Sequence, residues 1–144
     1  MKKFVTIQEG FDLSLKEIAL LAKQAGFDGV FVSKEEGIIT DEDMDYIKSI
    51  GLEIETVHLT YNTPRRLMYD FWGNTDLAED TLNILKKDID FAYKHNINKV
   101  VCHSSCGGPN KTEPNMKGVE WYRKLCDYAK VKNIIVCFEN IKHL

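Results

Sequence analysis

The chain has 144 residues, of which 44% are hydrophobic, so it is long and apolar enough for one domain with a buried core. Its formal net charge of −3 disfavours nucleic-acid binding through a broad basic surface. Its apolar runs are far shorter than the roughly 18 residues of a membrane span, and no signal-peptide pattern is present. The 4 cysteines have no zinc-ribbon spacing. We therefore expect a cytoplasmic protein with free thiols and without a membrane partner.

The first part of the chain alternates strand and helix. Strands are predicted over Lys3–Gln8 and Gly29–Val32, which are short, apolar and rich in β-branched residues. Between them, Ser14 is a suitable N-cap for a helix that should end at Gly26, because glycine readily adopts the left-handed conformation after a helix. A second helix should start after Thr40, since the three acidic residues that follow favour a helix N-terminus.

The same alternation continues to the end of the chain. Helical patterns cover roughly 77–95 and 115–130, whereas the stretch from Thr60 to Asp76 shows no regular pattern. The later strands are predicted over Glu53–His58, Lys99–His103 and Ile134–Phe138. Uninterrupted βα alternation predicts an α/β fold with parallel strands, as either a doubly wound sheet or a (β/α)8 barrel. No glycine-rich fingerprint follows the first strand, which disfavours a dinucleotide-binding domain.

Three predicted strands lead into a side chain that can bind a metal. His58, His103 and Glu139 each follow a short apolar run. Because the carboxyl ends of parallel strands meet at one edge, we expect the three side chains to converge. Two imidazoles and a carboxylate suit Zn²⁺, Mn²⁺ or Mg²⁺, which could polarise a carbonyl or activate a bound water. The alternative is that the histidines are hydrogen-bonded structural residues and that Glu139 caps the next turn.

Other residues near the strand ends are candidates for substrate binding. They are Gln8, Tyr61, Trp72 and Asn140. Trp72 could form one wall of a sugar site, or it could pack its loop onto the rim of the sheet. The charged residues 34–36 follow the second strand and could also contact a substrate, but solvated loop charges are the simpler interpretation.

The segments ETVHLTYN, KVVCHSS and IIVCFEN, together with the order of the elements, resemble the xylose isomerase-like TIM-barrel superfamily. This superfamily includes sugar phosphate isomerases and epimerases and the family 2 apurinic (AP) endonucleases. The resemblance spans essentially the whole chain. It implies a partial (β/α)8 TIM barrel of five parallel strands and four helices, forming a single domain over residues 1–144. It also implies that Glu139 is a metal ligand. His58 and His103 would be ligands in the endonuclease branch and more often substrate contacts in the isomerase branch.

The chain departs from this superfamily by ending after the fifth strand, because the family barrel has eight. The resemblance therefore implies a divalent-metal-dependent isomerase or epimerase of a small sugar or sugar phosphate that is incomplete alone. The base that moves the proton has no matching position here. Because unpaired edge strands favour association, we expect a homo-oligomer that covers the open side of the barrel. The alternatives are a metal-dependent phosphodiesterase of the AP-endonuclease type, which the acidic charge disfavours, and a non-catalytic sugar- or metal-binding module.

Overall fold

The computed structural model describes residues 1–8, 12–35, 39–62, 64, 67–104 and 114–139. Within these residues, five parallel strands form one sheet whose strand order follows the sequence. The strands are β1 (Phe4–Thr6), β2 (Gly29–Ser33), β3 (Glu53–His58), β4 (Lys99–His103) and β5 (Ile135–Glu139). The prediction of five parallel strands is thus confirmed, with β3 and β4 at the predicted bounds.

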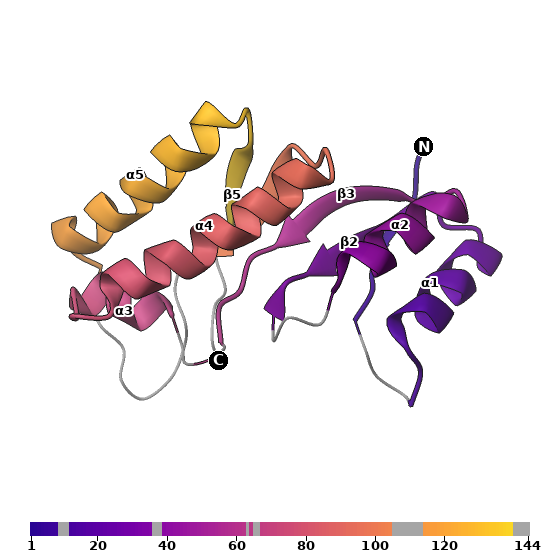
Figure 1. The fold of residues 1–144 in the computed structure, drawn as a ribbon, viewed down its shortest axis with the longest axis horizontal. Coiled ribbons are helices and arrows are strands. Elements are labelled where there is room, and N and C mark those ends of the chain that lie inside the picture. The colour runs from indigo at the N-terminus through magenta and orange to yellow at the C-terminus, as the bar shows by residue number, and fades with distance from the viewer. Residues whose placement is uncertain (9–11, 36–38, 63, 65–66, 105–113, 140–144) are drawn as a thin grey trace.

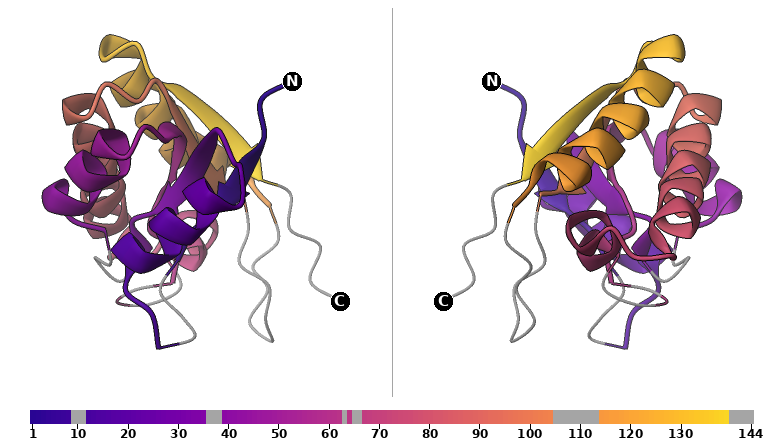
Figure 2. Two further views of the ribbon diagram at one scale, coloured as in Figure 1. Left: turned by 90° about the vertical axis from the view of Figure 1, so that its right-hand side faces the viewer. Right: turned by 90° about the vertical axis from the view of Figure 1, so that its left-hand side faces the viewer.

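The connections between the strands are helical, and the helices lie on one side of the sheet (Figure 1). The sheet is curved, with the helices around its outer side (Figure 2). None of the helices in the described ranges has the length and apolarity needed to cross a bilayer. The helices are α1 (Leu15–Gln24), α2 (Asp41–Ser49), α3 (Met68–Gly73), α4 (Ala78–Lys94) and α5 (Met116–Val131).

The starts of α1 and α2 follow from local side-chain chemistry. The Ser14 hydroxyl accepts the backbone N–H of Glu17, and the Glu17 carboxylate accepts the N–H of Ser14 at 2.8 Å, which makes a capping box. Thr40 and Asp43 form the same arrangement at α2. Beyond the other end of α1, Gly26 has a φ of +80°, so the predicted glycine terminator is confirmed.

The prediction of four helices was wrong, because the described residues form five and α3 is the additional one. Its sequence gave no helical signal because Leu67, at the N-cap position, makes no side-chain hydrogen bond and the helix has only six residues. Tertiary packing holds it instead. Phe71 is fully buried, and the Trp72 indole lies so close to Gly118 of α5 that a Cβ there would come within 2.0 Å of it.

The two faces of the sheet have different surroundings. Buried strand residues such as Val30, Val57 and Val100 belong to the same core as Leu85 of α4 and Leu125 of α5. The inner face is open, and Ile135 of β5 is 60% exposed there. One residue is inserted in β3, because Val30 pairs with Ile54 while the next residue, Phe31, pairs with Thr56. Simple alternation predicts that Ile54 and Thr56 share one face of the sheet. Because of the inserted residue, they lie on opposite faces.

Candidate metal centre

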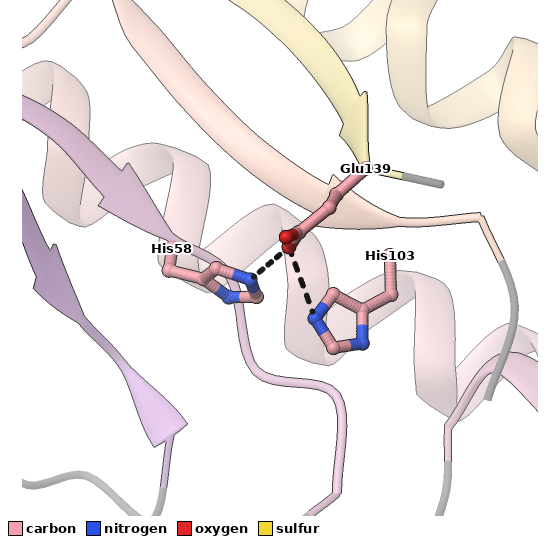
Figure 3. A group of neighbouring side chains, drawn as sticks. All are labelled: His58, His103 and Glu139. Atoms are coloured by element: carbon pink, nitrogen blue, oxygen red, sulfur yellow. Dashed lines mark ion pairs between the residues drawn. The ribbon is translucent and has the colours of Figure 1, made fainter. Parts of the chain in front are cut away.

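Strand register brings the three predicted ligands to one edge of the sheet. His103 and Glu139 are direct neighbours across β4 and β5. His58 lies beside Val101, two residues before His103. All three side chains point toward one another from the ends of adjacent strands (Figure 3). The convergence follows from parallel pairing, because equivalent ends of parallel strands lie at the same edge.

The distances among the polar atoms are short. Nε2 of His58 and Nε2 of His103 each lie 3.4 Å from Oε2 of Glu139. One donor atom from each residue can be chosen so that all lie within 4.8 Å of one another. The imidazole rings are nearly perpendicular, with an interplanar angle of 87° and centroids 4.7 Å apart. The carboxylate thus lies between two ring nitrogens that face it.

The tautomer of His58 follows from its neighbour. Its Nδ1 lies 2.8 Å from the carbonyl oxygen of Leu59, and a carbonyl can only accept, so Nδ1 carries the hydrogen and donates it. Neutral His58 therefore presents the lone pair of Nε2 toward Glu139. A backbone bond of this kind orients a metal-binding imidazole and selects its coordinating nitrogen.

This donor set fits a divalent ion. Two donors bound at about 2.1 Å to a tetrahedral ion lie about 3.4 Å apart, which matches the separation of each histidine from Glu139. Three protein donors leave one position of such an ion for water or substrate. The His103 side chain is 7% exposed and that of Glu139 is 51% exposed, so the cluster is anchored on its buried side and open to solvent on the other.

A cavity of about 440 Å³ adjoins the cluster on the inner face of the sheet. Its wall is mostly apolar, and threonine hydroxyls add polar groups. The lining residues are Thr6, Phe31, Val32, Thr56, His58, Val101, Cys137, Phe138 and Glu139. A small ligand in this cavity would therefore be able to touch His58 and Glu139 as well as apolar side chains.

The structure describes three of the four predicted substrate-binding residues, and they lie in different surroundings. Tyr61 is beside it, with its ring centroid 4.0 Å from that of His103. Gln8 is exposed just after β1. Trp72 packs between α3 and α5, where its Nε1 donates to the carbonyl oxygen of Ser104 at 2.8 Å. Asn140 lies outside the described residues.

Two carboxylates near the cluster were not predicted as site residues. Glu35 was interpreted as a solvated loop charge, but its carboxylate accepts the backbone N–H groups of Tyr61 and Asn62. Asp88 of α4 accepts the N–H of Thr60. The sequence contains one indication of this role, at Asp88. This charged residue is adjacent to Ile89 on the apolar side of α4, where a charge is unusual unless it is paired.

Comparison with solved structures identifies the fold, whereas no family model and no curated protein matches the sequence. An L-ribulose 3-epimerase matches with a TM-score of 0.68 and 18% identity, over 96% of this chain and 49% of that one. A family 2 AP endonuclease from Brucella melitensis matches with a TM-score of 0.71 and 18% identity, over 96% and 55% of the two chains. A xylose isomerase-like TIM-barrel protein from Mycobacterium smegmatis, in complex with magnesium, matches with a TM-score of 0.60 and 13% identity, over 95% and 54%.

The chain has the fold of part of a xylose isomerase-like TIM barrel. It spans about half the length of the solved structures that it matches. The predicted partial barrel is thus confirmed. In this barrel the cluster of His58, His103 and Glu139 lies at the carboxyl ends of the strands, where TIM-barrel enzymes place their active sites.

Proposed function

We propose that the chain is part of a divalent-metal-dependent isomerase or epimerase of a small sugar or sugar phosphate. The observation that carries the proposal is the convergence of His58, His103 and Glu139 on one point beside a cavity. Sugar 3-epimerases are among the proteins that share the fold, which supports this substrate class. Zn²⁺, Mn²⁺ and Mg²⁺ all remain candidates for the ion.

In this proposal some residues of the site hold the ion and others contact the substrate. A bound divalent ion would act as a Lewis acid on a substrate oxygen. Glu139 supplies the negative charge that holds the ion, and the Leu59 carbonyl keeps Nε2 of His58 turned toward it. Phe31 and Val101 provide apolar contacts for the carbon skeleton, while the hydroxyl of Thr56 offers a hydrogen bond to a sugar hydroxyl.

We also propose that a second copy of the chain covers the open inner face. Both β1 and β5 are edge strands within the described sheet, and the inner face exposes apolar side chains such as Ile135. Glu139 is the one carboxylate among the described residues that line the cavity, and in this proposal it binds the ion. The proton-transferring base would then come from outside this set, which a covering chain can supply.

Calorimetric titration with Zn²⁺ and Mn²⁺ tests the metal site. Glu139→Ala should reduce the affinity by at least about tenfold, because it removes the charged donor that faces both histidines. Glu53→Ala is the matched control, since it removes an exposed strand carboxylate that pairs with Lys2. Equal affinities of wild type and Glu139→Ala would refute the assignment.

A substrate panel separates the proposed reaction from the second candidate function. The match to an AP endonuclease favours testing a metal-dependent phosphodiesterase. The protein, loaded with metal, is incubated with ketoses, aldoses and their phosphates, and separately with an oligonucleotide that contains an abasic site. Interconversion of sugars supports the proposal, whereas strand cleavage replaces it with the second function. Metal binding without product from either would indicate a non-catalytic binding module.

A further inference from the structure

The segment Thr60–Asn62, which begins two residues after the end of β3, is held by two carboxylates from other parts of the chain. The N–H of Thr60 donates to Asp88 of α4 at 2.8 Å. The N–H of Tyr61 donates to Glu35 at 2.7 Å, and that of Asn62 donates to the same carboxylate at 3.0 Å. Three successive backbone amides therefore donate to carboxylates, which accept stronger hydrogen bonds than neutral groups do.

The burial of Asp88 shows how tightly this segment is anchored. Asp88 is only 5% exposed, and burial raises the pKa of its carboxyl group, although hydrogen bonds from Thr60 and the charge of Lys34 act in the opposite direction. A buried carboxylate is costly unless it is well hydrogen-bonded. Its bonds to Thr60 therefore fix the start of the segment relative to α4.

The anchored segment places the Tyr61 ring against both candidate histidine ligands. Its centroid lies 4.0 Å from that of His103, with an interplanar angle of 34°. It lies 5.3 Å from that of His58, at 63°. One aromatic ring thus contacts both imidazoles, and it limits rotation of each about its χ2 angle.

We infer that Glu35 and Asp88 are positioning residues of the candidate metal centre, because they hold the Tyr61 ring where it fixes the planes of His58 and His103. The role in metal binding rests on the proposed function, whereas the contact of Tyr61 with the two histidines does not. The two carboxylates bind the backbone of the Thr60–Asn62 segment, which carries Tyr61. Each acts through backbone amides and one aromatic ring, as outer residues do when they orient metal ligands.

Nuclear magnetic resonance of the metal-free protein tests the positioning step. The ring current of Tyr61 shifts the ring-proton resonances of His103, and Tyr61→Leu defines their values without that ring. Glu35→Ala should move these resonances toward the Tyr61→Leu values, and Asp88→Asn should move them in the same direction. Glu17→Ala is the matched control, since it removes a carboxylate that accepts a backbone amide in the capping box of α1, and it should leave them unchanged.

Unchanged His103 resonances in folded Glu35→Ala would overturn the inference. Glu35 is only half-buried, so its truncation leaves no large void. If Glu35→Ala nevertheless fails to fold, Glu35→Gln preserves the side-chain length but leaves one acceptor oxygen instead of two, so the His103 resonances should move in the same direction by a smaller amount.

Zinc affinity provides the second measurement. Glu35→Ala should weaken Zn²⁺ binding by about tenfold, the lower end of the effect of losing an outer residue at a metal site, whereas Glu17→Ala should bind as wild type does. If the resonances move but the affinity does not, the role in the metal centre is refuted. If the wild type binds no metal, the proposed function fails, and the resonance comparison still decides whether Glu35 and Asp88 position Tyr61.

Discussion

Replacing Gly118 with alanine should destabilise the protein, although alanine is the better helix former. In a helix, Gly→Ala ordinarily stabilises by roughly 0.5–1 kcal/mol. At Gly118, however, the new Cβ would lie 2.0 Å from Cε3 of Trp72 and 2.5 Å from Cζ3. Carbon atoms pack at about 3.5–4.0 Å, so the indole must move by about 1.5 Å.

That movement determines the expected magnitude. Overpacking of a core contact costs about 1–3 kcal/mol, and displacement of the indole also weakens its hydrogen bond to the Ser104 carbonyl oxygen, worth about 1 kcal/mol. After the gain in helix propensity is subtracted, the free energy of unfolding of Gly118→Ala should be about 1–3 kcal/mol below that of the wild type.

Urea unfolding followed by circular dichroism measures this difference. A control in the Trp72→Leu background should reverse the sign, because the smaller side chain leaves room for the Cβ and the helix propensity then dominates. A stabilised Gly118→Ala protein in the wild-type background would refute the packing of α3 on α5 described above. The packing matters for the site, since Ser104 directly follows His103.

Two further predictions concern pH and association. Lys94, and then His95, lower the pKa of the Asp41 carboxyl, so its stabilising effect is present above the unfolded-state value near 3.8 and is lost as the pH falls through the lower folded-state value. The difference in unfolding free energy between wild type and Asp41→Asn should accordingly shrink as the pH falls below about 3.8, and a difference constant with pH would contradict this. In analytical ultracentrifugation at micromolar concentration the chain should sediment as a dimer or larger assembly, and a compact monomer would contradict the proposed cover of the inner face.

Local sequence patterns were sufficient for the strands and the longer helices. Capping residues such as Ser14 and Thr40 act within a few positions, so they mark helix starts without any tertiary information. The convergence of His58, His103 and Glu139 was also predictable, because parallel pairing alone brings the ends of adjacent strands together.

The remaining features depend on contacts between distant residues. Helix α3 exists because Phe71 and Trp72 find a complementary surface on α5, and no residue inside the helix reports that surface. The extra residue in β3 became visible only through its pairing with β2. Glu35 resembled any surface glutamate, since its role depends on where the chain passes 26 residues later. Hydrophobic periodicity and local propensity do not identify such non-local partners.

The position of Glu139 on an edge strand has a consequence for assembly. Within the described sheet β5 pairs with β4 and has no strand on its other side, and most of its side chains are exposed. A divalent ion bound by Glu139 and the two histidines would act as a cross-link among β3, β4 and β5, tying the outermost strand to its more buried neighbours. Bound metal would then favour, by mass action, the state in which β5 is paired with β4. Removal of the metal would weaken the attachment of β5, the strand with which an additional strand on that side would have to pair.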